Sequence, residues 1–586
     1  MKNYMLSLLM SVAFLSAAYA QTKPEPRPYI EPETPGTLDA LPWLQVPEGL
    51  QLGWALADYH HERHTVPIDV VGKDTTLTVW KGERIGLQAV VYSREPMDDL
   101  EIRVAKATSK PLRTQVQCGL MRYLITDGFQ ACGDHPTDLP AYLVDDIIDD
   151  ATDLSINSCE TRPIWLNIEV PSHITAGSYI TGIDIYSRKE QKVIANLCAQ
   201  IDIIDRALPQ PKDYTIHLNF WMQPYAASRY YDLVPYSQEH LETLRPYMQL
   251  LARAGQKVAT AILFYEPWGV QSHDKFQPMI ETSRKADGSW AYNYDIFDRW
   301  ISFLETCGID RQINCFSMVP WDMSFRYYDE VSKSYRALQT TTDTEEYKEL
   351  WTSFLQSFAS HLKAKGWYDK TTIAMDERAL KDMLNAYEVA QAAVPGIKLS
   401  LAGNYHPELA DKVFDYCIAY GQHFTEEELS ARKAKGWIST TYNCCSEAAP
   451  NILANSEPAE ATYVPLYCAA NHFDGYLRWA WMNWPDNPLC DSRFRMFSPG
   501  DTYSIYPGPR SSQRFERFIH GIEAFEKVNV LRKEYKARGN ETALQELETA
   551  LSQFLSSDIE QAEKAGPLYR DILKVLNKPK QKLKRR

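Results

Sequence analysis

Short stretches in which apolar and polar residues alternate fill the chain between residues 50 and 208. Alternation with a period of two is typical of strands that have one buried and one solvated face. Turn residues separate the stretches and no long helical pattern interrupts them, so we predict an antiparallel β-sandwich over residues 49–210. The clearest strand candidates are 76–93, 100–107, 163–172, 177–187 and 193–205.

After residue 211 the pattern changes to apolar strand, loop and amphipathic helix, repeated along the chain. Eight such strands alternating with helices predict a (β/α)₈ TIM barrel over residues 211–530. A doubly wound open sheet fits less well, because the chain has no GxGxxG motif. The candidate strands are 214–221, 258–264, 313–321, 371–377, 398–406, 414–420, 436–444 and 473–484. The clearest candidate helices are 238–254, 294–306, 344–365 and 378–393.

The last part of the chain is helical and rich in charge, as in RFERFIHGIEAFEKVNVLRKEY and TALQELETALSQFL. We expect the first of these helices to complete the barrel. The remainder, residues 531–586, is predicted to be a C-terminal helical extension that packs outside it.

The N-terminus has the features of a secretory signal peptide. Lys2 precedes an apolar run over residues 5–17, and a small-x-small site ends at Ala20. This pattern predicts a signal peptide over residues 1–20 and export to a periplasm or out of the cell. Residues 21–48 are interpreted as an extended, proline-rich lead-in. No later apolar run reaches the length of a membrane span, so we expect no membrane anchor.

Composition and charge narrow the class of partner. The net charge of −14 argues against nucleic acid or an anionic membrane as the partner. The 15 Trp and 35 Tyr suit a carbohydrate-handling protein, and they equally suit large cores. The oligomeric state is left open.

Eleven cysteines are an odd number for an exported chain. Cys118 and Cys132 bracket a predicted loop and are the expected disulfide pair. Cys444 and Cys445 are adjacent and cannot pair with each other without distortion. No Cys/His spacing typical of a metal site occurs, so we predict no metal and no other cofactor.

Polar and aromatic residues recur where the predicted barrel strands end, and the active sites of such barrels lie at those ends. The fourth strand runs directly into two adjacent acids, Asp376 and Glu377. Adjacent carboxylates raise each other's pKa, which catalysis can require. The alternative is that Asp376 caps the next helix and Glu377 is a first-turn acid. We interpret Glu266 and Asp322, at two other strand ends, as loop acids.

An acidic pair near tryptophans, without metal-ligand or nucleophile motifs, favours chemistry at a glycosidic bond, and two mechanisms are open. A conventional retaining glycosidase needs a second carboxylate about 5–5.5 Å away across the sugar, for which Glu447 is the candidate. In a substrate-assisted enzyme the 2-acetamido oxygen of the sugar is the nucleophile, and two adjacent acids at a strand end can serve it. A non-catalytic glycan-binding protein is the alternative from another class.

Four motifs resemble glycoside hydrolase family 123. They are MDE (375–377), DGYLRWAWMNW (474–484), GDTYSIYPG (500–508) and, in the sandwich, WKGERIGLQAVVY (80–92). The resemblance implies a β-sandwich followed by a (β/α)₈ barrel, and an exo-acting retaining β-N-acetylgalactosaminidase whose partner is a glycan with terminal β-GalNAc. It implies that Asp376 orients the acetamido group and that Glu377 is the general acid and then the base. By analogy with related barrels, Tyr442 is our candidate for a hydroxyl against the acetamido oxygen.

Other strand-end residues are candidates for substrate binding, each with a structural alternative. Trp481 and Trp484 either floor the sugar site or cap the barrel core. Asn404 and His406 either bind sugar hydroxyls or, for His406, cap the following short helix. Asp501 either binds O4 and O6 of a galacto sugar or fixes its own turn. The remaining candidates are Trp221, Trp321 and Asn483.

Overall fold

The structure is a computed structural model and describes residues 25–33, 38–133, 139–494 and 496–580. The predicted signal peptide over residues 1–20 lies outside the described residues, as do residues 21–24 and 34–37 of the lead-in.

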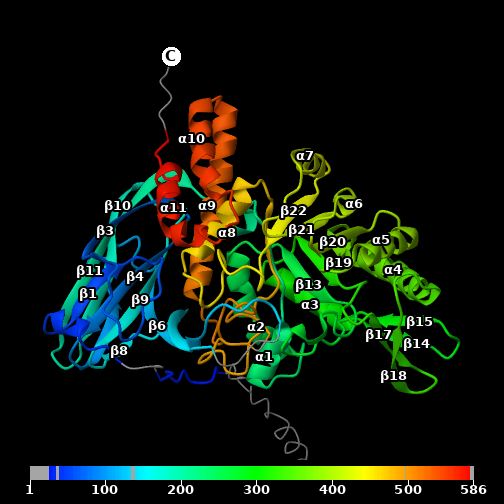
Figure 1. The fold of residues 1–586 in the computed structure, drawn as a ribbon, viewed down its shortest axis with the longest axis horizontal. Coiled ribbons are helices and arrows are strands. Elements are labelled where there is room, and N and C mark those ends of the chain that lie inside the picture. The colour runs from blue at the N-terminus through cyan, green and yellow to red at the C-terminus, as the bar shows by residue number, and fades with distance from the viewer. Residues whose placement is uncertain (1–24, 34–37, 134–138, 495, 581–586) are drawn as a thin grey trace, which may run out of the picture.

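The N-terminal domain is a pair of packed β-sheets, as the alternating pattern predicts (Figure 1). One sheet has the strand order β2-β1-β4-β9-β6-β7 and the other β3-β11-β10-β5-β8. Neighbouring strands are antiparallel except β3 and β11, which run parallel. The strands are β1 (Gln51–Ala55), β2 (Val70–Gly72), β3 (Asp74–Lys81), β4 (Arg84–Ser93), β5 (Met97–Val104), β6 (Val116–Thr126), β7 (Tyr142–Ile148), β8 (Asp153–Ile156), β9 (Glu160–Glu169), β10 (Gly177–Ser187) and β11 (Lys192–Ala207).

Alternate residues of these strands form one core, to which both sheets contribute. This is the expected result of side chains that point to opposite faces at successive positions. The residues of β4 in this core are Ile85, Leu87, Ala89 and Val91.

The second domain is built on eight parallel strands in the order β12-β23-β22-β21-β20-β19-β16-β13. All eight predicted strands are confirmed. Every residue of β13, β16 and β19 is buried, which explains their continuous apolar runs. The strands are β12 (His217–Phe220), β13 (Val258–Ile262), β16 (Gln312–Phe316), β19 (Thr371–Met375), β20 (Lys398–Gly403), β21 (Asp415–Ala419), β22 (Ile438–Tyr442) and β23 (Gly475–Arg478).

A side-chain amide closes the barrel between β12 and β13. Lys257 donates its backbone N–H to the Leu218 carbonyl at 3.0 Å. The Gln256 amide accepts from the Phe220 N–H at 2.9 Å and donates to the Phe220 carbonyl at 3.0 Å. Both groups at the end of β12 are thereby satisfied without a regular ladder.

Helices surround the barrel, and the four predicted from sequence are confirmed as α2, α3, α4 and α5. Local signals set their ends: the Thr344 side chain caps the start of α4, and Gly366 ends it with a φ of 72°. The helices are α1 (Pro224–Tyr231), α2 (Gln238–Arg253), α3 (Asp295–Thr306), α4 (Glu345–Lys365), α5 (Leu380–Ala393), α6 (Pro407–Ala410), α7 (Glu426–Ala434) and α8 (Glu460–Ala470).

A small four-stranded sheet, absent from the sequence-based expectation, grows from the loops after β13 and β16. It lies at the outer edge of the barrel in Figure 1. Its strands are β14 (Glu281–Arg284), β15 (Trp290–Asn293), β17 (Ser324–Asp329) and β18 (Ser334–Gln339).

Helix α9 (Gln513–Arg538) lies between the two domains, with α10 (Glu541–Leu551) and α11 (Gln561–Leu576) stacked beside it (Figure 1). Buried ion pairs join α9 to the sandwich. They are Arg514–Asp146 at 2.9 Å, Arg517–Asp58 at 2.7 Å and Lys527–Glu83 at 2.6 Å. Separating such a pair would leave a buried charge without its partner, which is strongly unfavourable. These contacts therefore fix the sandwich against the barrel.

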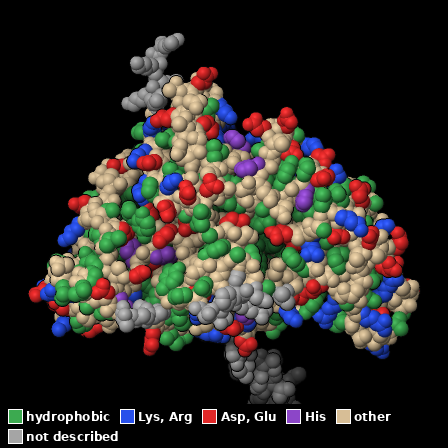
Figure 2. Space-filling view, viewed as in Figure 1, with side chains coloured by type: hydrophobic (Ala, Val, Ile, Leu, Met, Phe, Trp, Pro, Cys, Tyr) green, Lys and Arg blue, Asp and Glu red, His purple; other side chains and the backbone are tan. Residues whose placement is uncertain are grey.

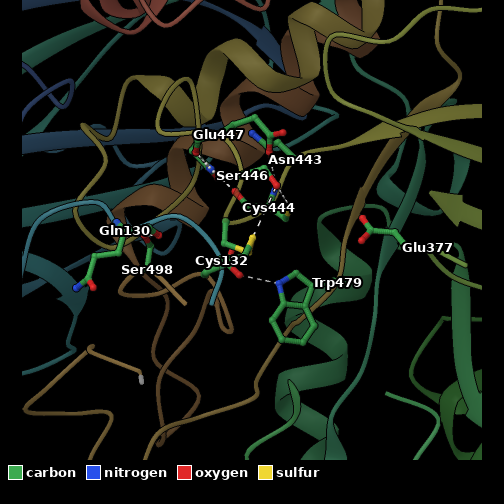
Figure 3. Close-up of a disulfide and its surroundings, with 12 residues drawn as sticks. Gln130, Cys132, Glu377, Asn443, Cys444, Ser446, Glu447, Trp479 and Ser498 are labelled. Atoms are coloured by element: carbon green, nitrogen blue, oxygen red, sulfur yellow. Dashed lines mark hydrogen bonds between the residues drawn. A yellow bond between two sulfur atoms is a disulfide. The ribbon is translucent and has the colours of Figure 1, made fainter. Parts of the chain in front are cut away.

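A disulfide also joins the two domains. Cys132, in the loop between β6 and β7, is bonded to Cys445, which follows β22 (Figure 3). The expected Cys118–Cys132 pair is therefore wrong, and Cys118 is a free, half-buried thiol. Sequence spacing suggested the nearer partner, whereas domain packing brings together residues 313 positions apart.

Removing this disulfide should destabilise the protein by about 2–4 kcal/mol, because the cross-link restricts the unfolded chain. The measurement is chemical denaturation of the Cys132→Ser/Cys445→Ser double variant against wild type, without reductant. Cys118→Ser is the matched control, and it should change the unfolding free energy much less. Equal losses in the two proteins would contradict the prediction.

Acidic and basic side chains are interspersed over the face of the molecule in Figure 2. Among the described helices, none combines the length and the apolar character that crossing a membrane requires.

Candidate active site

The acid pair lies at the mouth of the barrel, directly after β19. Helix α5 begins at Leu380 and its N-cap position is Ala379, without a side-chain cap. The alternative in which Asp376 caps this helix is therefore wrong. Because both acids follow the last strand residue, Met375, strand alternation no longer forces them to opposite faces.

Asp376 is buried and held by one neighbour. Its Oδ2 accepts a hydrogen bond from the Trp321 indole at 2.8 Å, and within the described residues its Oδ1 has no partner. Burial raises the pKa of Asp376 to about 7 and the Glu377 charge adds to the rise, whereas the Trp321 hydrogen bond and the Arg378 charge lower it. The carboxyl therefore changes charge near neutral pH.

Glu377 is exposed and accepts a hydrogen bond from the Tyr442 hydroxyl. Tyr442 is buried, and burial together with the Glu377 charge raises its pKa far above the usual value. The phenol thus stays protonated and remains a donor. Gly403, at the end of β20, packs against Glu377, since a Cβ there would lie 3.4 Å from the Glu377 Cα.

Glu447 is engaged with its own loop. Its Oε2 accepts from the Cys444 backbone N–H at 2.8 Å, and burial raises its pKa. In Figure 3 it lies on the other side of the Cys444 loop from Glu377.

Trp321 and Trp221 occupy different parts of the site. Trp321 is 37% exposed, and the Arg378 guanidinium lies over its ring at 4.7 Å. Trp221 is buried and stacks on Trp268 with ring centroids 5.2 Å apart. The indole N–H groups of both stacked rings have no partner in the described part of the chain.

Asp501 has no exposed surface, and both of its carboxylate oxygens have partners. It pairs with Arg478 at 2.6 Å and accepts from the Trp479 indole at 2.8 Å. Its expected contact with sugar hydroxyls is therefore corrected: it positions Trp479. Trp479, which sequence reasoning missed, is half-buried directly after β23 and lies beside the Cys444 loop in Figure 3.

Of the other residues predicted after β23, two are core residues. Trp481 and Trp484 have no exposed surface, so the core position that was their alternative is the observed one. Trp481 packs edge-on against Phe220, and the Trp484 indole donates to the Ile505 carbonyl at 2.8 Å. Asn483 is buried, and its Oδ1 accepts from the His273 backbone N–H at 2.9 Å.

Asn404 and His406 lie on the rim, after β20. Asn404 is exposed, and its Oδ1 accepts from the Gln422 side chain at 2.9 Å. His406 holds the N-cap position of α6, but its side chain makes no capping bond. Its backbone N–H donates to the Tyr416 hydroxyl at 2.7 Å.

Several buried polar atoms without a partner in the described residues follow four of the eight barrel strands. Trp221 follows β12, Glu266 and Trp268 follow β13, Asp376 follows β19 and Asn483 follows β23. Buried polar groups are normally hydrogen-bonded, so this concentration among the described residues marks a site for a polar ligand. Each had a sequence signal, namely its position just after a strand, but nothing local distinguished it from a loop residue.

Two family profiles match the chain. The one described as glycoside hydrolase 123, catalytic domain, matches residues 221–531, more than half of the chain, and the glycoside hydrolase 123 N-terminal domain matches residues 54–187. No curated protein matches the chain significantly.

Among solved structures, the fold is similar to that of a family 123 glycoside hydrolase from Clostridium perfringens, with a TM-score of 0.81 and 22% identity over 90% of this chain and 98% of that chain. A putative glycoside hydrolase from Bacteroides vulgatus aligns at 9% identity over 79% of each chain, with a TM-score of 0.30. At these values the first likeness shows the shared fold and the second carries no weight.

Proposed function

Because the chain belongs to glycoside hydrolase family 123, we propose that it is an exo-acting retaining β-N-acetylgalactosaminidase that works by substrate assistance. The observation that carries the proposal is that the two adjacent acids have different surroundings. Asp376 is buried with one oxygen bonded to Trp321, whereas Glu377 beside it is exposed. Adjacent carboxylates in such different environments suit two different tasks.

In the proposed first step, the ionised Asp376 accepts the acetamido N–H of the bound sugar. The acetamido oxygen attacks C1, the bond from C1 to the leaving oxygen breaks, and Glu377 gives its proton to that oxygen. Asp376 stabilises the positive charge that develops on the oxazolinium ion. In the second step Glu377 takes a proton from water, which adds to C1 and restores the acetamido group.

The intramolecular nucleophile explains why a second carboxylate across the sugar is not required. Well-oriented intramolecular groups reach effective molarities of about 10⁵–10⁸ M. The conventional retaining mechanism needs Glu447 opposite Glu377, and the Glu447 side chain is instead bonded to the Cys444 backbone. A protein that only bound glycans would not need the two adjacent acids, Asp376 and Glu377, to have such different surroundings.

The proposed substrates are glycans with terminal β-GalNAc, including those of glycolipids. The solved family member from Clostridium perfringens is described through glycolipid glycan hydrolysis, which supports this class. We also propose that the protein acts in a periplasm or outside the cell. The signal-like residues 1–20 and the Cys132–Cys445 disulfide, which suits an oxidising compartment, support that location.

The test is hydrolysis of p-nitrophenyl β-GalNAc with GalNAc-thiazoline, a mimic of the oxazoline, as inhibitor. Turnover that the thiazoline blocks would support substrate assistance. Turnover of plain p-nitrophenyl β-galactoside, with none of any β-N-acetylhexosaminide, would reject it.

The pH profile should depend on the Trp321 indole. We expect kcat/KM to rise with pH around pH 7, as Asp376 loses its proton and becomes an acceptor. The indole N–H favours the ionised carboxylate, so Trp321→Phe should raise the Asp376 pKa and move this limb to higher pH.

Trp367→Phe is the matched control, because the Trp367 indole also donates to a carboxylate, that of Glu305, at 3.0 Å. It should leave the limb in place. If the rise of kcat/KM in Trp321→Phe stayed at the same pH or moved to lower pH, its assignment to Asp376 would be contradicted.

A further inference from the structure

We propose that Glu266, one of the two acids interpreted from sequence as loop acids, binds the hydroxyl groups on C4 and C6 of the terminal sugar and so selects GalNAc over its C4 epimer. This inference rests on the proposed function. It names a binding residue for the edge of the sugar that the acid pair does not contact.

Backbone contacts fix Glu266 in place and connect its loop to Trp321. Glu266 follows β13, and its N–H donates to the Phe276 carbonyl at 3.1 Å. The next carbonyl, that of Pro267, accepts from the Trp321 N–H at 3.0 Å. Since the Trp321 indole holds Asp376, one continuous set of contacts links Glu266 to the acid pair.

Glu266 carries two local penalties. Its φ is 49°, a left-handed conformation that is unfavourable for a residue with a side chain. Its Oε1 is buried without a partner among the described residues, and burial raises the pKa of the carboxyl to about 7. Strained backbone and unsatisfied buried groups tend to collect at functional sites.

The neighbours of Glu266 suit a sugar. Trp268 follows it on the same loop and stacks on Trp221, and both rings are at most 5% exposed. Their two unpartnered indole N–H groups are donors, whereas the Glu266 carboxylate is an acceptor. A sugar hydroxyl donates and accepts at once, so this combination matches it.

The strand order sets which edge of the sugar Glu266 meets. Strand β16 separates β13 from β19, so the two strands that lead to Glu266 and Asp376 are two strand intervals apart, or about 10 Å at the usual spacing. A single pyranose ring with a hydrogen bond at each edge spans such a distance. With the acetamido group of C2 on Asp376, the opposite edge carries O4 and O6. In GalNAc the axial O4 lies near O6, so one carboxylate can accept from both.

The experiment combines two variants with three substrates. Glu266→Gln keeps the shape of the side chain and Glu266→Ala removes it, and the substrates are p-nitrophenyl β-GalNAc, its 4-deoxy analogue and p-nitrophenyl β-GlcNAc. Hydrogen bonds to a charged group are worth about 1.5–3 kcal/mol each. We therefore expect Glu266→Ala to lower kcat/KM for GalNAc about 10- to 150-fold for each of the two hydrogen bonds that it removes. Glu266→Gln should lower it less, and the GalNAc/GlcNAc ratio should fall in both variants.

The 4-deoxy analogue separates contact from general damage. It should lose activity with wild type but little more with Glu266→Ala, since the same contact is already gone. Asp322→Asn, a change at an exposed acid next to the same loop, is the control and should leave the ratio unchanged. Thermal unfolding checks that each variant is folded.

The assignment would be overturned if the loss of kcat/KM caused by Glu266→Ala and the loss caused by removing the 4-hydroxyl multiplied when combined. An unchanged GalNAc/GlcNAc ratio would overturn it as well. In both cases the proposed function would stand. A wild type without activity on any β-N-acetylhexosaminide would reject the proposed function itself, and this assignment with it.

Discussion

Glu377→Gln should lose about 10²- to 10⁴-fold in kcat/KM on a β-GalNAc substrate whose leaving group is a sugar or another alcohol. Such a group leaves as a strongly basic alkoxide unless it is protonated, and in the proposed mechanism the exposed Glu377 supplies that proton. A dinitrophenyl leaving group needs no proton, so the same variant should cleave that substrate almost as fast as wild type. The measurement is kcat/KM for a series of leaving groups.

Glu447→Gln is the matched control, because it makes the same chemical change at the rival carboxylate. It should leave the slope against leaving-group pKa as in wild type. If Glu377→Gln were slowed equally on every leaving group, Glu377 would not be the general acid. If Glu447→Gln abolished activity, the conventional mechanism would return.

The eight barrel strands could be read from sequence because each is a short apolar run buried on both faces. The acid pair could be read for a related reason: the fold places the residues that follow a barrel strand at one mouth. Position after a strand therefore predicted the location of Asp376 and Glu377. It did not predict their environments, which depend on Trp321 in the loop after β16 and on Tyr442 at the end of β22.

Contacts made by residues far apart in the sequence account for what could not be predicted. Asp501 is withdrawn from the site by Arg478, and Cys132 finds Cys445 only after the domains pack. Trp484 follows a strand as the candidate site residues do, but it has no exposed surface and lies in the core. The alternation of side chains predicts which side of a strand a residue faces. This prediction ends at the last strand residue, and the candidate site residues lie in the loops that follow.

The side-by-side acids are explained by the different surroundings that the barrel gives them. Two carboxylates in the same surroundings would only repel each other. Here burial and the Glu377 charge hold the pKa of Asp376 near 7, while Glu377 stands in solvent beside a phenol donor. The pair thus combines a buried carboxyl that must ionise to act with an exposed carboxyl that is free to reach the leaving oxygen, and the proposed mechanism needs one of each.

Asp376→Asn should lower kcat/KM for p-nitrophenyl β-GalNAc by about 10²- to 10³-fold, the usual effect of removing one group that stabilises transition-state charge. The amide cannot offset the positive charge of the oxazolinium ion, so a good leaving group should not restore the rate, in contrast to Glu377→Gln. The rise of kcat/KM around pH 7 should also disappear, because the group that titrates there is gone.

The same substitution should stabilise the fold, and the sign follows from the pKa. The folded protein holds the Asp376 proton up to about pH 7, whereas the unfolded chain releases it near the ordinary value of 3.8. Ionisation therefore opposes folding increasingly as pH rises between these values, by up to about 4 kcal/mol above pH 7. Asp376→Asn should match wild type in unfolding free energy below pH 3.8 and exceed it at pH 8. A variant that is less active but no more stable at pH 8 would mean that Asp376 is already ionised and compensated in the folded protein, and the raised pKa would be wrong.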